Sequence, residues 1–328
     1  MLKRSKDLEW IMWKKNCCKT LWGILAIICL ISANSCSTPK EAGSPGEPAS
    51  FTDALDRTVK LEKKPERVAA LLGSFAHIWC LAGGEICAAT DDAKEDFGLD
   101  SAGLIELGGA HSPSMEMLLS ADPDFVLASS STPAHVNMRE SLEQAGIAVA
   151  YFDVDSFEDY LAMLKICTEL TESPENFQKY GTNIEEKILK IKSDFQKKSL
   201  KDADKTVLVL RISSGLVKAK SSKGTILGEM LADLGCINLA DQDETLTEHL
   251  NLEYIMQQNP RHILVVTMGD EEKAKKNFQS MMEENPAWST LEAVKENRMH
   301  LLDQSLFNQK PNDRWDIAYE TLAELLLS

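Results

Sequence analysis

Short runs of apolar, often β-branched residues alternate along the chain with stretches whose apolar positions recur every three or four residues. The first pattern is typical of buried strands and the second of amphipathic helices. A regular alternation of the two favours an α/β fold with mainly parallel sheets. The pattern predicts seven strands, at residues 67–71, 86–90, 125–129, 147–152, 206–212, 262–267 and 299–302.

Two pairs of segments repeat the same pattern. The stretches SMEMLLSADPDFVLASS, from Ser114, and NLEYIMQQNPRHILVVT, from Asn251, each carry a Glu seven residues before a Pro, an amphipathic helix and then a strand; they start 137 residues apart. Upstream, SFAHIWCLAGGEICAAT and TILGEMLADLGCINLAD each read as a helix that ends at a glycine C-cap. The repetition predicts two similar, Rossmann-like lobes.

Between the repeats, residues 156–200 have no strand pattern and are rich in helix formers. Apolar residues recur at helical spacing on both sides of Pro174, which marks a break. One long helix or a kinked pair is therefore expected to join an N-terminal lobe at 51–155 to a C-terminal lobe at 201–328. Because a helical joint is stiff, the lobes should rock modestly rather than close widely.

The first part of the chain has the features of an export signal. The apolar run 21–33 is too short to span a bilayer, follows three lysines and precedes small residues at Ala33 and Ser35. It resembles a bacterial lipobox, which implies cleavage of residues 1–35 and lipid attachment to Cys36; the departure is Ala33, where an aliphatic residue is more usual. A plain signal peptide with an incidental cysteine, or a buried core helix, remain the alternatives.

After Cys36 the chain is polar, with five Gly or Pro residues between 37 and 49. Such a segment buries too little apolar surface to fold, so residues 36–50 are expected to form a flexible tether. The predicted location is the outer face of the cytoplasmic membrane, with the lipid as the anchor.

The net charge and the cysteine content exclude further classes of function. The chain has a net charge of −16, which becomes −20 once residues 1–35, with six basic and two acidic side chains, are removed. This acidity argues against nucleic acid as a partner. The remaining cysteines lie inside apolar runs and are expected to be buried free thiols rather than disulfides or metal ligands; they are Cys80, Cys87, Cys167 and Cys236.

Four segments follow one another in a characteristic order: FTDALDRTVKLEKKPERVAAL, PSMEMLLSADPDFVLAS, the central helix, and the C-terminal NPAWSTLEAVKENRMHLLDQSLFNQKPNDRWDIAYETLAELL. In this order they resemble the substrate-binding proteins of bacterial ABC importers for iron complexes and vitamin B12. The resemblance covers Phe51 to Leu327. It implies two lobes bridged by one rigid helix and a monomer that meets an ABC permease and its ATPase. The implied cargo is an iron chelate, first a ferric siderophore, with cobalamin or another corrinoid, or haem, as the alternative, and no permanently bound cofactor.

The alternative from a different class of function is an exported metal-dependent enzyme on a chelatase-like fold. The sequence lacks a nucleophile elbow, an HExxH motif, and paired carboxylates at helical spacing beside a histidine. An enzyme would also leave the tether without a purpose, so the sequence indicates a binding protein.

Ligands of open α/β sheets bind outside the carboxyl ends of the strands, so the loops after the predicted strands should line the inter-lobe cleft. A flat or chelated ligand needs aromatic faces and a few cations. In addition, Pro133 can begin a helix whose free N–H groups hold an anionic group. The candidate ligand-binding residues are Ser74, Phe75, Ser130, Ser131, Tyr151, Arg211, Phe307, Arg314 and Trp315, with Lys310 in the same last loop.

Histidines form a separate hypothesis. His111 and His249 each lie a few residues before the repeated Glu, in what should be equivalent loops of the two lobes, from which they could hold a haem iron or a metal directly. The alternative is two solvated loop residues, since zinc sites usually need three or four ligands. His77, His262 and His300 lie within predicted elements and are expected to be structural.

The resemblance also implies permease contacts, because the family carries a surface Glu on each lobe. The C-lobe position falls on Glu229 and the N-lobe position on His77, where the family has Glu. This departure implies a weaker or pH-dependent contact, a shift to a neighbour such as Glu85, or a different permease surface.

Overall fold

A computed structural model describes residues 49–328. The expectations for the signal segment, for lipid on Cys36 and for nearly all of the tether lie outside these residues. No helix within 49–328 combines the length and apolar character that crossing a bilayer requires. Strand β1 (Ala49–Thr52) begins inside the segment expected to be tether, because it pairs in an antiparallel hairpin with β2 (Thr58–Leu61) that the sequence pattern did not indicate.

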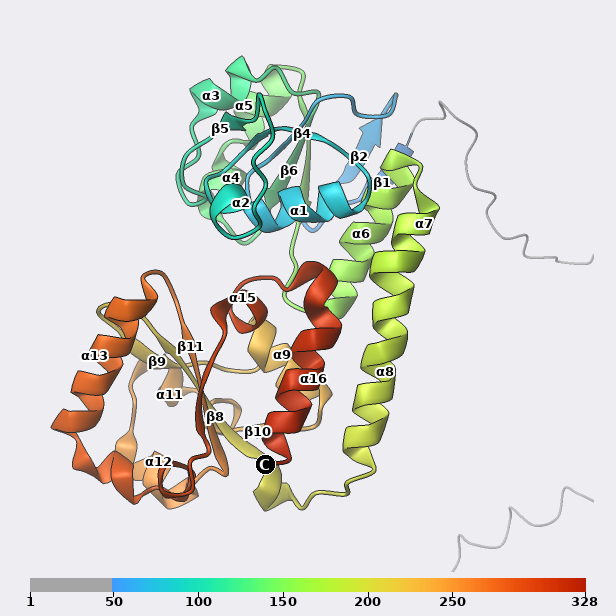
Figure 1. The fold of residues 1–328 in the computed structure, drawn as a ribbon. Coiled ribbons are helices and arrows are strands. Elements are labelled where there is room, and N and C mark those ends of the chain that lie inside the picture. Colours follow the sequence, from blue (N-terminus) through green and yellow to red (C-terminus); the bar gives the residue numbers. More distant parts are fainter. Residues whose placement is uncertain (1–48) are drawn as a thin grey trace, which may run out of the picture. The chain divides into compact units, whose positions relative to one another are not determined.

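The N-terminal lobe is built on a five-stranded parallel sheet (Figure 1). Its strands, in spatial order, are β5 (Ile105–Glu106), β4 (Ile86–Ala89), β3 (Val68–Ala70), β6 (Phe125–Ser129) and β7 (Ala148–Phe152). The helices between them are α1 (Gly73–Leu81), α2 (Asp92–Glu95), α3 (Met115–Ser120), α4 (Pro133–Asn137) and α5 (Arg139–Gln144).

The C-terminal lobe repeats this plan. Its sheet runs β10 (Ile237–Asn238), β8 (Thr206–Ile212), β11 (His262–Thr267) and β12 (Met299–Leu302), all parallel, with β9 (Val217–Ala219) antiparallel to β8. Its helices are α9 (Ile226–Asp233), α10 (Leu239–Gln242), α11 (Thr245–Glu248), α12 (Leu252–Gln258), α13 (Glu271–Glu284), η3 (Pro286–Thr290), α14 (Glu292–Lys295), α15 (Gln304–Phe307), η4 (Asn312–Arg314) and α16 (Trp315–Leu326). The short η2 (Asp202–Lys205) leads into β8.

The internal repetition read from the sequence is present in three dimensions. The N-caps of the two repeated helices act alike: Ser114 Oγ accepts the N–H of Met117 at 3.2 Å before α3, and Asn251 Oδ1 accepts that of Tyr254 at 3.1 Å before α12. Glycines with positive φ follow α1 and α9 at Gly83 and Gly235. The two-lobe α/β architecture is therefore confirmed.

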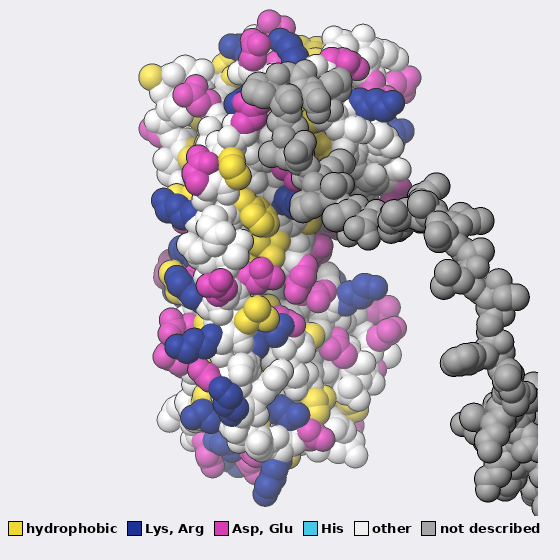
Figure 2. All heavy atoms as spheres, turned by 90° about the vertical axis from the view of Figure 1, so that its right-hand side faces the viewer, with side chains coloured by type: hydrophobic (Ala, Val, Ile, Leu, Met, Phe, Trp, Pro, Cys, Tyr) yellow, Lys and Arg dark blue, Asp and Glu magenta, His cyan; other side chains and the backbone are white. Residues whose placement is uncertain are grey.

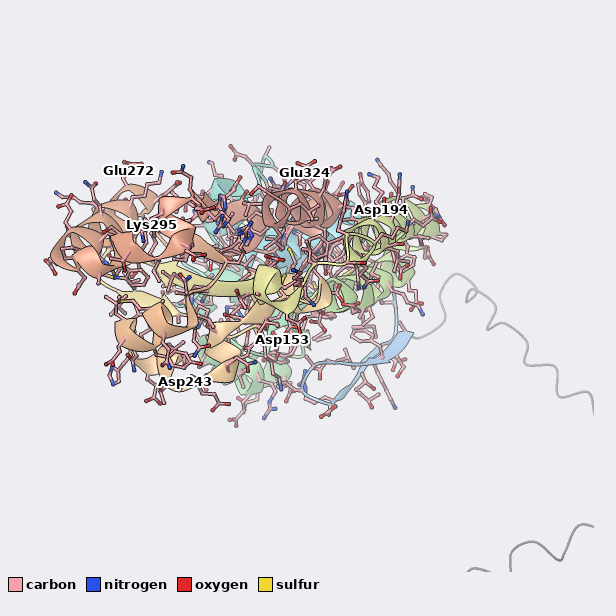
Figure 3. The ribbon with its side chains drawn as sticks, turned by 90° about the horizontal axis from the view of Figure 1, so that it is seen from below. Asp153, Asp194, Asp243, Glu272, Lys295 and Glu324 are labelled. Atoms are coloured by element: carbon pink, nitrogen blue, oxygen red, sulfur yellow. The ribbon has the colours of Figure 1, made fainter. Side chains whose placement is uncertain are left out.

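The lobes are joined by α6 (Phe157–Thr171) and then by a helical run over 174–196, made of α7 (Pro174–Phe177), the π-turn η1 (Gln178–Thr182) and α8 (Asn183–Gln196). A capping box at Ser156 starts α6, and a left-handed Glu172 ends it. The Tyr160 hydroxyl donates to the Tyr180 carbonyl at 3.0 Å, which ties α6 to the π-turn. Helix α6 packs on α1, and α8 packs on α16; seen from below in Figure 3, Asp194 of α8 and Glu324 of α16 mark these neighbours.

One apolar core passes through both lobes. It includes Phe125 of the first sheet, Phe157 of α6, Ile188 of α8 and Val209 of the second sheet, all at most 5% exposed. Two smaller clusters cover the opposite faces of the two sheets. On the face in Figure 2, acidic and basic side chains are mixed. Between the helices, Lys187 of α8 bonds Asp316 of α16 at 2.7 Å.

Candidate functional site

Parallel strands in each lobe bring their carboxyl ends to one edge of the sheet. We call the loops after β3, β6 and β7 of the first lobe and after β8, β11 and β12 of the second the strand-end junction. Contacts between the lobes occur here: the Asn312 side chain of the second lobe bonds the Ser74 carbonyl of the first, and Asp155 lies beside Gly224. The junction is therefore where loops of both lobes meet.

The serine-rich loop after β6 is held by a histidine that the sequence analysis did not consider. His135 is fully buried, its Nδ1 accepts the Ser129 N–H at 3.1 Å, and its Nε2–H donates to the Ala110 carbonyl at 2.7 Å. Burial lowers the pKa of His135, so the ring stays neutral and keeps this pattern. The hydroxyls of Ser129 and Ser131 lie 2.9 Å apart, while Ser130 is half-buried and Ser131 exposed.

Most of the predicted aromatic contacts lie in the core. Phe75, Tyr151 and Trp315 have no exposed surface, and Phe307 is only 2% exposed. The Tyr151 hydroxyl donates to the His135 carbonyl at 3.0 Å, and the Trp315 ring packs 5.9 Å from that of Phe157. These rings stabilise the walls of the junction and offer no face to a ligand in this conformation. Trp79 of α1 is likewise a core residue and is only 2% exposed.

Three of the predicted polar residues do reach the junction. Arg211, near the end of β8, is half-buried and its Nε has no hydrogen-bond partner among the residues described. Arg314 is half-buried and approaches the Ser305 carbonyl at 3.5 Å. Ser74 is 7% exposed, and its carbonyl accepts from Asn312. Lys310 is also half-buried here, close to Asp153 and Asp155 of the other lobe (Asp153 is labelled in Figure 3).

His77 takes part in an inter-lobe contact. Asn312, fully buried in the second lobe, donates its Nδ2 to the Ser74 carbonyl at 3.0 Å and to His77 Nδ1 at 3.1 Å. The His77 ring also packs 5.1 Å from that of Phe97. Burial lowers the pKa of His77, with Asp313 opposing and Arg314 reinforcing the shift. The imidazole is half-buried, so a permease would meet only part of it; its role in docking stays a prediction.

Glu229 lies in the first turn of α9 and is half-buried. Its Oε1 accepts the Gly224 N–H at 2.9 Å, beside the Thr225 cap of the helix. The carboxylate is therefore fixed in orientation with part of its surface open, which is compatible with the predicted contact to the permease but does not test it.

The hypothesis that His111 and His249 hold an iron or another metal finds no third ligand among the described residues. His111 and His249 are both exposed, and no group of three or more His, Cys, Asp or Glu side chains within 49–328 is placed to hold a metal ion. Direct binding of an iron by this pair stays a prediction. The four cysteines of the described body are free thiols, as expected, but only Cys167 is buried, whereas Cys80, Cys87 and Cys236 are partly exposed.

Cavities also occur away from the junction. One of about 290 Å³ lies where the end of α8 meets the end of α9, lined by Phe195, Lys205, Asp233 and Gly235 among others. Another of about 280 Å³ lies between α8 and α16. Side chains that already form ion pairs line part of each cavity, Lys205 and Asp233 in the first and Lys187 and Asp316 in the second. Neither cavity lies at the carboxyl ends of the strands, where ligands of open α/β sheets bind.

Comparison with known proteins identifies the scaffold. Residues 69–306 match the periplasmic binding protein family. The chain belongs to this family. Among relatives, the iron-uptake system-binding protein of Bacillus subtilis is 26% identical over 190 residues, which cover 58% of each chain, so the match spans less than two thirds of that relative. The high-affinity heme uptake system protein IsdE of Staphylococcus aureus is 25% identical over 67% of this chain and 73% of its own.

Solved structures show the same fold. Staphylococcus aureus SirA complexed with staphyloferrin B matches with a TM-score of 0.64 at 20% identity, over 84% of this chain and 96% of that one. IsdE complexed with heme matches with a TM-score of 0.64 at 19% identity, over 80% and 99% of the two chains. These structures, under 25% identical to the chain, show its fold, and the family match makes it a periplasmic binding protein. Both relatives are named as proteins of uptake systems rather than as enzymes.

Proposed function

We propose that this protein is a lipid-anchored receptor that captures a ferric siderophore at the strand-end junction and delivers it to an ABC permease and its ATPase. The observation that carries the proposal is the junction itself, where loops from two like sheets meet and where the charge of Asp155 of the first lobe acts on both Arg211 and Lys310 of the second. The iron is cargo in this proposal, so the protein needs no resident metal.

The ligand is tested by thermal unfolding of residues 37–328, which include the whole described body and its cores. The panel contains ferric hydroxamate, ferric catecholate, ferric citrate, haem and cobalamin. A ligand at about 100 times its dissociation constant adds about 2.7 kcal/mol to the free energy of unfolding. A raised melting temperature with a ferric siderophore supports the proposal. A raised melting temperature with haem or cobalamin alone would make that compound the cargo instead of a siderophore. An unchanged melting temperature with all five compounds would contradict the proposal that the protein is a receptor for such ligands.

The lipid anchor is tested in cells by Cys36→Ala. The variant should leave the membrane fraction and appear in the medium or the soluble extracytoplasmic fraction. Cys29→Ala, within the apolar run, is the matched control and should stay with the membrane. Retention of the Cys36 variant would contradict the anchor.

Docking is tested by Glu229→Gln, which removes the charge but keeps an acceptor for the Gly224 N–H. Uptake should fall while ligand affinity is unchanged, because the contact proposed is with a permease arginine. Glu253→Gln, on exposed α12 of the same lobe, serves as the control. Equal uptake by both variants would show that Glu229 does not contribute to docking.

A further inference from the structure

Basic side chains gather at one side of the strand-end junction. Arg211 of β8 lies opposite Lys218 of β9 in the antiparallel pair, and Lys220 directly follows β9, where its N–H donates to the Val209 carbonyl of β8. Lys310 reaches this region from the loop after α15. Arg211, Lys220 and Lys310 are half-buried, whereas Lys218 is exposed.

These cations lack direct counter-ions. Within residues 49–328, Arg211, Lys220 and Lys310 form no ion pair, and Arg211 Nε is buried without a hydrogen-bond partner. Taking a charge out of water without pairing it is unfavourable, so burial should make these groups easier to deprotonate. Burial lowers the pKa of Arg211, of Lys220 and of Lys310, and the charge of Arg211 adds to the effect on Lys220.

The acidic groups nearby do not neutralise the set. The charges of Asp155 and Asp153 act on Lys310, yet neither carboxylate comes within ion-pair distance of it. The carboxylate of Asp159 is occupied by the N–H groups of Asp155 and Ser156 and by the Ser156 hydroxyl. Burial raises the pKa of Asp153, and the charge of Asp155 adds to this. The junction therefore holds more partly desolvated positive charge than free negative charge.

We propose that Arg211 and Lys310 determine the specificity of the site for chelates with exposed anionic oxygens, those of the carboxylate or catecholate class, over neutral hydroxamate complexes. This inference rests on the proposed function and narrows its substrate class. The planar guanidinium of Arg211 suits a carboxylate or a pair of chelating oxygens. Lys310 supplies a second positive charge, and the charge of Asp155 acts on both residues. An anionic ligand would give the unpartnered Nε of Arg211 its missing acceptor.

The experiment measures dissociation constants by quenching of tryptophan fluorescence, using residues 37–328. The probes are ferric citrate, an anionic ferric tris-catecholate and a neutral ferric tris-hydroxamate. The variants are Arg211→Gln and Lys310→Gln, with Lys218→Gln as the matched control because that lysine is exposed on the same strand face. Arg211→Lys keeps the positive charge but loses the planar guanidinium, which can donate two parallel hydrogen bonds. Melting curves identify any variant that does not fold.

The parent protein should bind at least one anionic complex more tightly than the neutral one. Each glutamine variant should lose about tenfold or more in affinity for it, with a shallower salt dependence, and Arg211→Lys should recover part of the loss. Preference for the neutral complex, or full affinity in Arg211→Gln and Lys310→Gln, overturns this inference and leaves the receptor function standing. If the protein binds none of the three iron complexes, the siderophore-receptor proposal is refuted and the inference falls with it.

Discussion

A buried histidine, His262, which stacks on the half-buried His300, makes the stability of the second lobe depend on pH. His262, the first residue of β11, has no exposed surface, and its ring lies 5.9 Å from that of His300 on β12. Neither ring nitrogen of His262 has a hydrogen-bond partner among the described residues, and the same is true of His300 Nε2. Burial, helped by the charges of His300 and Arg261, lowers the pKa of His262 from 6.5 to about 4.

The sign of the effect follows from which state takes up the proton. The unfolded chain binds a proton at this residue below its ordinary pKa of 6.5, whereas the folded chain resists until about 4. Stability is therefore complete above 6.5 and is lost as the pH falls toward 4. Linkage puts the loss from this one group at about 2 kcal/mol between about pH 7.5 and about pH 5.

The perturbation is His262→Leu, a residue of similar volume that removes two unpartnered nitrogens from an apolar environment. Denaturation by urea at the two pH values gives the free energy of unfolding of variant and parent. The advantage of the variant should grow by about 2 kcal/mol at the lower pH, while His249→Leu, at an exposed site, should show no such growth. An advantage of the same size at both pH values would refute the reasoning, because the histidine would then titrate normally in the folded protein.

Two further substitutions test other buried polar groups. Asn312 has φ 54°, so Asn312→Ala should lose its two bonds to the first lobe and add backbone strain, about 3 kcal/mol in all by urea denaturation. Asn312→Gly should lose less, and a glycine variant weaker than the alanine variant would contradict the strain. Burial alone would raise the pKa of Asp53, but hydrogen bonds from Arg57 and nearby N–H groups hold it below its usual value. Asp53→Asn should therefore cost roughly 3 kcal/mol of unfolding free energy well above the usual pKa of 3.8, and little once the pH falls below the lowered pKa of the folded protein. A loss that does not depend on pH would exclude the ion pair as the cause.

The strands of the core could be predicted because burial on both faces leaves a continuous apolar run. The bounds predicted for β6, β8, β11 and β12 are those observed. The pattern missed β1 with β2, and also β5, β9 and β10, because short edge strands carry few apolar residues and depend on their partners for their conformation. The helical joint was also found, but its π-turn was not, since a single extra residue leaves no signal in the composition.

Positions at the site were harder to predict than the fold. Sequence order locates the end of a strand, so Ser130, Ser131 and Arg211 were found, but it does not say toward which side a ring after that strand turns. Tyr151 and Trp315 consequently lie in the core. His77 meets a partner more than 230 residues away, Asn312, and no local pattern indicates a contact that only the folded chain creates.

The π-turn at Gln178–Thr182 sets the rotational phase of the helix that follows it. A π-turn holds about one residue more than a regular turn, and one residue corresponds to about 100° around the helix axis. With the extra residue present, Ile184, Ile188 and Phe195 point into the core shared by the two lobes. Deletion of one residue within the turn would give a more regular helix that presents a charged face to that core. The irregular turn thus fixes the chain length of this segment, and insertions or deletions should be tolerated far better in the loop after Gln196 than here.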